Sequence, residues 1–366
     1  MPVLKKIIVS GYKNIVFQEL EMSRGINCIT GNNGEGKTNL LDAIYYLSMT
    51  KSAFSQSDKY NSINGCGEFA ISGSYLFENG TENRYSAVMK KGEKTFRVNE
   101  KAYEKLSEHI GVLPIVMVSP YDTSIVNESA EERRRFMNML LSQLDREYLH
   151  ALQSYNRILL QRNSLLKAGN ADRSLLAVFD SRLSAPAAYV YEKRKAFVER
   201  VLPEVRRYYS EVSDNDPLID IVYRSDLAAG DMESLLFSTY GQDTAAGHTT
   251  KGIHRDELEF MTGGLPLRKC GSQGQQKSFT VALKFAQYAI MREVYGFPPL
   301  MLLDDLFDKL DLSRVSNLLR IVLGKGFGQI FITDCNKERM KSIVDSMTEE
   351  KAYFEVKSGV FTPINI

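Results

Sequence analysis

The chain has 366 residues, and its 46 Lys and Arg nearly balance 45 Asp and Glu, which leaves a net charge of +1. Apolar residues make up 43% and charged residues 25%, a globular composition that excludes wholesale disorder. At about 150 residues per domain, the length allows two or three domain equivalents. Bulk charge gives no argument for a nucleic-acid partner, which would need a local basic patch.

The four cysteines are far apart in the sequence and form no C-x-x-C pair, so we expect neither a zinc site nor a disulfide framework. Sparse cysteine is typical of a reducing compartment. The N-terminus has too short an apolar run for a signal peptide. No stretch reaches 18 apolar residues, so we expect no membrane-spanning helix. The sequence therefore predicts a cytoplasmic protein without a membrane partner.

Strands and one amphipathic helix are predicted in the N-terminal third. Residues 26–30 form a short apolar strand, and the spacing of leucine and isoleucine predicts a helix over 37–48. Segments 69–76 and 84–89 are rich in β-formers and are separated by an Asn-Gly turn signal, which is typical of a hairpin. A fully apolar strand is expected at 113–118.

The middle third is predicted to be helical. Residues 131–167 contain no Gly or Pro, and their apolar residues recur three or four positions apart. This spacing predicts a long amphipathic helix, broken once near Asp145. A second helix over 173–209 is expected to be bent or split near Pro186 and Pro203. We expect the two helices to pair as an antiparallel arm.

Strand–helix alternation returns after residue 217. Strands are expected at 218–223, 257–262, 300–303, 329–333 and 353–356, and helices at 273–295, 313–322 and 337–347. Such alternation predicts an α/β architecture with a parallel, doubly wound sheet. We expect both ends of the chain to build one domain, into which the helical middle is inserted.

Residues 31–38 read GNNGEGKT and match the phosphate-loop pattern G-x-x-x-x-G-K-[ST] at every fixed position. Glycine lets successive N–H groups converge on an anion, and the start of the next helix adds its positive end. Lys37 would contact the outer phosphates, and Thr38 would offer a hydroxyl to Mg²⁺. An ordinary Gly-rich turn is the alternative, but both flanks also match the pattern. The predicted ATP-binding residues of this segment are Gly31, Asn32, Asn33, Gly34, Glu35, Gly36, Lys37, Thr38 and Asn39.

Two acidic residues follow the apolar run PPLMLL at 298–303. A buried strand of this kind delivers carboxylates to the C-terminal edge of a sheet, where ligands bind in open α/β folds. We predict that Asp304 holds Mg²⁺, directly or through water, and that Asp305 orients or deprotonates the attacking water. Because Asp is one methylene shorter than Glu, Asp305 predicts slow hydrolysis, suited to a switch. The alternative is a pair of acids that begins a loop.

A second candidate anion site precedes the helix predicted at 273–295. Ser272 is expected to cap this helix. Its hydroxyl, the Gly274 backbone and the helix N-terminus would together bind an anion. Since the chain already has a phosphate loop, we expect this second site to serve the triphosphate bound to another copy of the protein. A plain capped helix with a polar first turn is the alternative.

These motifs occur in the order found in ABC-type ATPase heads, and the wider sequence resembles the bacterial RecF recombination-repair family over nearly its full length. The resemblance rests on the phosphate loop, the Ser-x-Gly-Gln segment, the apolar-Asp-Asp strand and several further segments. The further segments are 11–14 (GYKN), 37–41 (KTNLL), 132–136 (ERRRF), 161–163 (QRN), 165–167 (LLK), 254–256 (HRD) and 272–277 (SQGQQK).

The resemblance implies an α/β fold, an ABC-type P-loop ATPase head with an inserted helical arm domain. The head would comprise residues 1–120 and 216–366, and the arm residues 121–215. It also implies a protein that dimerises on ATP, binds duplex and gapped DNA and hydrolyses ATP slowly with Mg²⁺. Such a protein would help RecR and RecO to load RecA in DNA repair and replication restart.

Roles for individual residues are implied by the same resemblance. Ser272, Gly274 and Gln275 would contact the nucleotide bound to the other subunit, and residues 310–311 would meet that subunit. Thr333 would sense the γ-phosphate, and Lys13 and Asn14 would lie near the base or ribose. The predicted catalytic residues are Asp305, Lys37, Asp304 and Thr333, and the predicted metal ligands are Thr38 and Asp304.

Basic residues concentrate in the helical middle. Residues 131–167 hold seven basic and four acidic side chains, and residues 191–209 hold six and three. Arg and Lys without a base-reading motif favour phosphate contacts and sequence tolerance. A solvated helix face is the alternative, and residues 133–135 could instead dock the arm to the head. The predicted DNA contacts are Arg133, Arg134, Arg135, Arg157, Arg162, Lys193, Arg194 and Lys195.

Two other functions stay open on the sequence alone. A P-loop kinase acting on a nucleotide or small molecule would need no second anion site. A truncated structural head of the chromosome-organising, SMC-like type would need long heptads leaving and returning to the head, and the middle third is too short for them. The segment 254–256 fits a structural network as well as catalysis.

Overall fold

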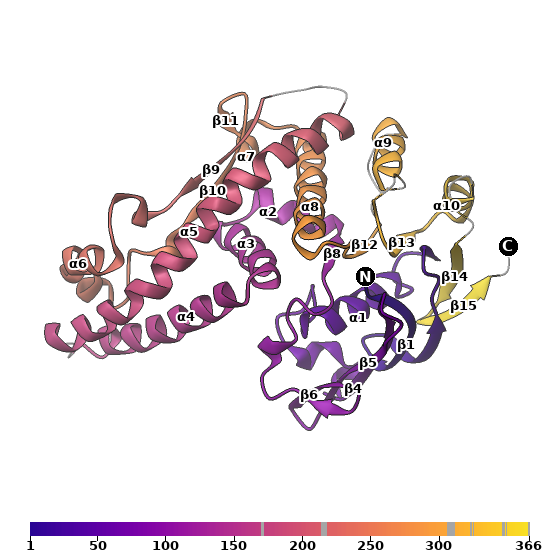
Figure 1. Cartoon of the computed structure of the whole chain (residues 1–366), viewed down its shortest axis with the longest axis horizontal. Coiled ribbons are helices and arrows are strands. Elements are labelled where there is room, and N and C mark those ends of the chain that lie inside the picture. Colours follow the sequence, from indigo (N-terminus) through magenta and orange to yellow (C-terminus); the bar gives the residue numbers. More distant parts are fainter. Residues whose placement is uncertain are drawn as a thin grey trace. The chain divides into compact units, whose positions relative to one another are not determined.

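A computed structural model of the chain describes residues 1–169, 172–213, 218–305, 312–322, 324, 326–345, 348 and 350–364 (Figure 1). The chain divides into two compact units, one of Met1–Asp122 with Gln287–Ile366 and the other of Thr123–Ala286. We call the first the head unit and the second the arm unit.

The head unit contains a mainly parallel sheet with strand order β15–β14–β3–β13–β12–β8, in which β15 runs antiparallel to its neighbour. The strands are β3 (Ile26–Thr30), β8 (Ile115–Val118), β12 (Leu300–Leu303), β13 (Ile330–Asp334), β14 (Lys351–Lys357) and β15 (Val360–Ile364). Every residue of β3, β12 and β13 is buried, as expected for parallel strands covered on both faces. The segments that follow these three strands therefore meet at one edge of the sheet.

A second, antiparallel sheet of the head unit has the order β2–β1–β4–β5–β6–β7. Its strands are β1 (Val3–Tyr12), β2 (Ile15–Glu21), β4 (Phe69–Leu76), β5 (Glu82–Lys90), β6 (Glu93–Val98) and β7 (Lys101–Ala102). Helix α1 (Lys37–Met49) packs against strands of both sheets and is buried over most of its length. Helices α9 (Leu312–Val322) and α10 (Lys337–Val344) complete this unit.

The arm unit is built on two long helices that lie side by side, α4 (Arg146–Lys167) and α5 (Arg173–Val212) (Figure 1). Asp145 ends α3 (Ala130–Leu144) and caps α4, because its side chain accepts from the Tyr148 N–H. The remaining elements are the strands β9 (Ile219–Arg224), β10 (Glu257–Thr262) and β11 (Leu265–Pro266), the helices α2 (Ser124–Asn127), α6 (Met232–Ala246) and α7 (Leu267–Cys270), and α8 (Gln273–Tyr295), which runs from this unit into the head unit. Short 3₁₀ turns lie at Asp58–Asn61, Ile63–Gly65, Leu106–Glu108, Pro120–Thr123, Asp226–Ala229 and Ile253–Arg255.

Most predicted elements are confirmed, several with the same bounds, including β3, β4, β10, β12 and α8. The prediction that the helix over 173–209 is split is wrong, because α5 is a single helix with Pro186 and Pro203 inside it. Strands β1 and β2 were not predicted from the sequence. Among the described residues, no helix is both long and apolar enough to cross a membrane.

The arm unit extends further along the chain than the predicted arm of residues 121–215. Strand β9 packs against α5, and β10 packs against α3. The arm unit accordingly includes residues 218–286, whereas the sequence assigned them to the second head segment. The Ser-x-Gly-Gln segment at the start of α8 accordingly lies in the arm unit.

Candidate nucleotide site

The phosphate loop connects β3 to α1 at the carboxyl edge of the parallel sheet. Gly34 and Gly36 have φ values of 85° and 114°, which side chains other than glycine rarely adopt. Gly36 is also the N-cap of α1, and no side chain caps this helix end. The first amides of a helix are a ready binding site for an anion, so the loop has the geometry that phosphate binding requires.

Lys37 lies inside the loop and is only 3% exposed. Its Nζ donates to the carbonyl oxygens of Gly31 at 2.9 Å and Asn32 at 3.2 Å. A longer contact of 3.4 Å reaches Asn33 Oδ1, and the carboxylate of Asp305 lies 3.7 Å away. The ammonium group is thus held by neutral oxygens and by one carboxylate beyond ordinary hydrogen-bond distance.

Asp304 follows β12, and its side chain forms hydrogen bonds with both the phosphate-loop segment and β13. Thr38 Oγ1 lies 2.9 Å from both of its carboxylate oxygens, and Thr333 Oγ1 donates to Oδ1 at 2.8 Å. Burial raises the pKa of Asp304 to about 6, although the two hydroxyl groups and Lys37 favour its charged form. A hydroxyl beside a carboxylate fits Mg²⁺, which binds through few protein oxygens together with substrate phosphates.

Asp305 adopts a left-handed conformation, with φ at 40°. A side chain other than glycine rarely occupies this region, and where it does the site is often functional. The Asp305 N–H donates to Thr333 Oγ1 at 2.8 Å, so Thr333 contacts both acidic residues. The structure therefore brings Lys37, Thr38, Asp304, Asp305 and Thr333 together, and we call these five residues the nucleotide cluster.

Lys13 and Asn14 lie in the turn between β1 and β2. Lys13 Nζ pairs with the carboxylate of Asp42 at 2.5 Å, and Asp42 also accepts from the Tyr12 hydroxyl at 2.7 Å. Asn14 contacts the phosphate loop itself, because its Nδ2 donates to the Glu35 carbonyl at 3.0 Å. Sequence patterns assigned no role to Asp42, a buried acidic residue one turn into α1.

Ser272 caps α8 in the arm unit, as predicted. Its hydroxyl accepts from the Gln275 N–H at 3.2 Å, and Gln275 Oε1 accepts from the Ser272 N–H at 2.8 Å. This reciprocal pair is a capping box, and both residues are accessible to solvent. The role of Ser272, Gly274 and Gln275 at a second subunit stays a prediction. Residues 310–311 lie outside the described residues.

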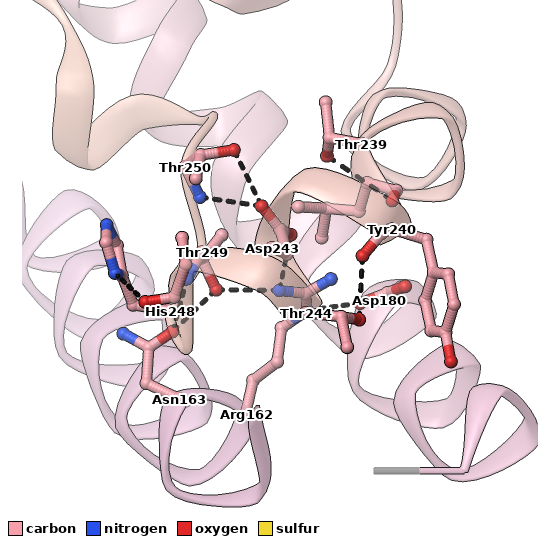
Figure 2. Close-up of polar contacts among 12 residues, drawn as sticks. Arg162, Asn163, Asp180, Thr239, Tyr240, Asp243, Thr244, His248, Thr249 and Thr250 are labelled. Carbon is pink, nitrogen blue, oxygen red and sulfur yellow. Dashed lines mark hydrogen bonds and ion pairs between the residues drawn. The ribbon is translucent and has the colours of Figure 1, made fainter. Parts of the chain in front are cut away.

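Three of the predicted DNA contacts are wrong, because their guanidinium groups are buried in ion pairs of the arm unit. Arg162 is fully buried between Asp180 at 2.6 Å and Asp243 at 2.7 Å, and it also donates to Thr249 (Figure 2). Its position on α4, between α5 and α6, makes it a structural residue. We call Arg162, Asp180, Asp243 and Thr249 the arm cluster.

Arg133 and Arg194 are buried in the same way. Arg133 forms a two-pronged pair with Glu257 at 2.7 and 3.0 Å. Arg194 Nη1 donates to Asp256 at 2.5 Å, and Asp256 also accepts from the Tyr223 hydroxyl. The segment 254–256 therefore takes part in a structural network.

His254 belongs to this network too. Its two ring nitrogens contact the Tyr155 hydroxyl at 2.7 Å and the Thr249 carbonyl at 3.1 Å. Burial lowers the pKa of His254 to about 4, so the ring is neutral near pH 7. A neutral ring with both nitrogens engaged is typical of a structural histidine.

Five of the predicted DNA contacts are less buried. Arg135, Arg157 and Lys195 are exposed to solvent. Lys193 is partly exposed and pairs with Asp145 at 2.7 Å, and Arg134 donates to the Asp256 carbonyl. The exposed residues stay candidates for phosphate contacts.

Comparison with known proteins gives consistent matches over nearly the whole chain. Residues 3–353 match the family model described as the RecF/RecN/SMC N terminal domain. The chain is 43% identical over 362 residues to the DNA replication and repair protein RecF of Parabacteroides distasonis, covering 99% of each chain. It is 40% identical over 359 residues to RecF of Bacteroides fragilis, covering 98% of this chain and 97% of the relative.

Solved structures agree with these sequence matches. A structure of the recombination mediator protein RecF-ATP in the RecFOR pathway superposes with a TM-score of 0.89 at 28% identity, covering 100% of this chain and 98% of the other. The Smc head domain of Pyrococcus furiosus, with an extended coiled coil, superposes with a TM-score of 0.57 at 14% identity, covering 100% and 96%. The second match shows a common fold only. The fold is thus that of the ABC-type ATPase heads.

Proposed function

The chain belongs to the RecF family, and from that premise we propose that it is an ATP-operated DNA-binding protein of replication and repair. The observation that carries the proposal is the nucleotide cluster, in which Lys37 and Thr38 of the phosphate loop meet Asp304 and Asp305 after β12 and Thr333 near the end of β13. The structure of a 28% identical relative described as RecF-ATP supports ATP as the ligand. Family membership also disfavours a P-loop kinase.

Each residue of the cluster would have one role in ATP hydrolysis. Lys37 would exchange its carbonyl partners for the outer phosphates, which offer an ammonium group full negative charges. Thr38 and Asp304 would hold Mg²⁺, which neutralises phosphate charge when bound. Asp305 would orient the attacking water or accept its proton. Thr333, which contacts the Asp304 carboxylate and the Asp305 backbone N–H, would sense the γ-phosphate. Because Asp305 is a short base, we expect hydrolysis to be slow.

We also propose that ATP joins two copies of the chain. The capped start of α8, with its exposed Ser272, presents helix amides and a hydroxyl that suit an additional phosphate. Since one phosphate loop already serves the nucleotide bound to its own copy, the second site would serve the nucleotide of a partner copy. Binding of ATP would hold the dimer together, and hydrolysis would release it.

Size measurement by light scattering tests this dimer. An Asp305→Asn variant, impaired in hydrolysis, should be monomeric without nucleotide and dimeric with ATP and Mg²⁺. Adding Ser272→Arg should prevent the dimer, whereas Ser238→Arg, at an exposed serine on α6, should not. A monomer with saturating ATP in the absence of either added substitution would contradict the proposal.

Family membership supports a proposal for DNA and protein partners. We propose that the chain binds duplex and gapped DNA through exposed basic residues of the arm, and acts with RecR and RecO to load RecA. The description of a solved relative as a recombination mediator in the RecFOR pathway supports this assignment. Binding to a gapped duplex, measured with and without ATP, should be stronger with ATP. Equal affinities would show that ATP does not control DNA binding.

A further inference from the structure

The turn between β14 and β15 contacts the phosphate loop. The Gly359 N–H donates to the Glu35 carbonyl at 2.8 Å, and Asn14 Nδ2 donates to the same oxygen at 3.0 Å. The Ser358 N–H donates to the Glu35 carboxylate. Asn14 is itself held, because its Oδ1 accepts from Asn39 Nδ2 at 2.7 Å. Glu35 therefore receives three hydrogen bonds from segments outside the loop, and we call Asn14, Ser358 and Gly359 the loop brace.

Three glycines allow this close approach. A Cβ on Gly359 would lie 2.3 Å from the Asn14 carbonyl oxygen, and a Cβ on Gly36 would lie 2.7 Å from the Asn14 side chain. A Cβ on Gly31 would lie 2.5 Å from the carbonyl oxygen of Val356 in β14. Real Cβ atoms do not come this close to other heavy atoms. The phosphate loop, the β1–β2 turn and the C-terminal hairpin thus meet where there is no room for a side chain.

The brace fixes the orientation of one peptide group in the loop. In a planar trans peptide, the carbonyl and the following N–H point in opposite directions. Hydrogen bonds that hold the Glu35 carbonyl therefore also set the direction of the Gly36 N–H, away from the brace. An anion is attracted by loop N–H groups and repelled by a carbonyl turned toward it. A peptide held in this orientation need not reorganise when a phosphate binds.

We propose that the loop brace is a positioning element that orients the Glu35–Gly36 peptide for the triphosphate. The proposal rests on the proposed binding of ATP and deepens it. In this proposal Asn14 does not make the contact with the base or ribose that the sequence predicted. It acts on the nucleotide indirectly, by holding the Glu35 carbonyl of the phosphate loop. It also makes the C-terminal hairpin, more than 300 residues from the loop in sequence, part of the nucleotide site.

A Gly359→Ala variant with a matched control tests the brace. Gly80 lies in the β4–β5 turn with φ at 79°, close to the 78° of Gly359, but a Cβ there would meet nothing within 4 Å. Both variants place alanine at a similar positive φ, and only Gly359→Ala presses on Asn14. Loss of one or two hydrogen bonds predicts roughly 5- to 20-fold weaker binding. Gly80→Ala should stay within about twofold of wild type.

Inorganic tripolyphosphate separates the brace from a contact with the nucleoside. Calorimetry with ATP and with tripolyphosphate, each with Mg²⁺, should show similar losses for Gly359→Ala. An Asn14→Leu variant is similar in size and adds no charge, but it loses both the donor to Glu35 and the acceptor for Asn39, so it should weaken the binding of both ligands too. Melting temperatures without ligand check that each variant is folded.

The outcomes are distinct. If wild type binds both ligands and the two brace variants bind them equally well, the brace is overturned while the proposed function stands. A loss confined to ATP would show that Asn14 contacts the nucleoside and would also overturn the brace. The same holds if Gly80→Ala loses as much affinity as Gly359→Ala. If wild type binds neither ligand, the proposed function itself fails, and the brace fails with it.

Discussion

The nucleotide cluster of the head unit and the arm cluster both contain buried charges, but their partners differ. Arg162 in the arm cluster is paired with two carboxylates at 2.6 and 2.7 Å (Figure 2). Asp304 in the nucleotide cluster is 2% exposed and contacts two hydroxyl groups, and within the described part of the chain it forms no ion pair. A buried cation that carboxylates of the protein already neutralise is suited to a structural role. A buried carboxylate completed only by hydroxyl groups is suited to a cation from solution.

The largest expected effect follows from removing the cation of the arm cluster. Arg162→Ala leaves the carboxylates of Asp180 and Asp243 without their cation, so it should lower the free energy of unfolding of the arm unit by about 3–5 kcal/mol. Urea titration of the full chain, followed by circular dichroism, measures this loss. Arg157→Ala, at an exposed arginine on the same helix, should change the value by less than about 0.5 kcal/mol. If both variants changed the free energy of unfolding by similarly small amounts, Arg162 would have no structural role.

Removing the cation of the nucleotide cluster should affect ligand binding instead. Lys37→Ala loses hydrogen bonds between an ammonium group and phosphates, which are worth about 2–3 kcal/mol, or roughly 30- to 150-fold in ATP affinity. Unfolding should change little, because Lys37 donates mainly to carbonyl oxygens. Isothermal titration with ATP measures the loss, and Lys101→Ala, at an exposed lysine of β7, serves as control. Unchanged affinity in Lys37→Ala would place the nucleotide elsewhere.

The buried carboxyl group of Asp304 should make the free energy of unfolding depend on pH. Burial raises its pKa from 3.8 to about 6, so the folded state favours the protonated carboxyl group. Its favourable contribution to stability is complete below pH 4 and is lost as the pH rises through 6. Without nucleotide at pH 8, Asp304→Asn should therefore raise the free energy of unfolding by about 1–3 kcal/mol. The same variant should lose the proposed Mg²⁺-dependent ATP hydrolysis.

The difference between the variant and wild type should shrink as the pH falls from 7 to 4, because wild-type Asp304 then becomes neutral as well. Urea titrations of both proteins at several pH values measure this difference in the free energy of unfolding. A variant less stable than wild type at pH 8 would show that the carboxylate has a structural partner, like the carboxylates of the arm cluster.

The smallest effect concerns the exposed basic residues. If Arg157 or Lys195 contacts a DNA phosphate, its replacement by alanine should reduce the slope of log K against log salt by about one. Affinity should fall to a similar extent on different DNA sequences. Arg224→Ala removes an exposed arginine of β9 that pairs with Glu259 of β10, and it should leave the slope unchanged. Unchanged slopes for both Arg157→Ala and Lys195→Ala would show that neither residue contacts a DNA phosphate.

The features that could be predicted from the sequence are those determined by residues close together in the chain. The phosphate loop and the acidic strand end are local patterns, and strand–helix alternation predicted that β3, β13 and β12 run parallel in one sheet. The position of Ser272 before a helix was also enough to predict a cap. These local features are sufficient to place Lys37 and Asp304 near one edge of the sheet.

The burial of the arginines could not be predicted in this way. Arg133, Arg162 and Arg194 each have an acidic partner far along the chain, at separations of 124, 81 and 62 residues. The second partner of Arg162, Asp180, is 18 residues away but lies on the next helix. Counting charges along one helix does not reveal these distant partners, so it wrongly suggested that the three arginines are exposed and available to DNA. The loop brace depends on a contact between residues 35 and 358, and for the same reason no local pattern indicated it.

Hydrogen exchange of the wild-type chain, with and without ATP and Mg²⁺, tests the central claim most directly. If the nucleotide cluster is the ligand site, amides of residues 31–40 and 303–305 should exchange more slowly with ATP, and residues 158–166 around Arg162 should change far less. Unaltered exchange at 31–40 under saturating ATP would contradict the account, whatever changes occur in the arm unit.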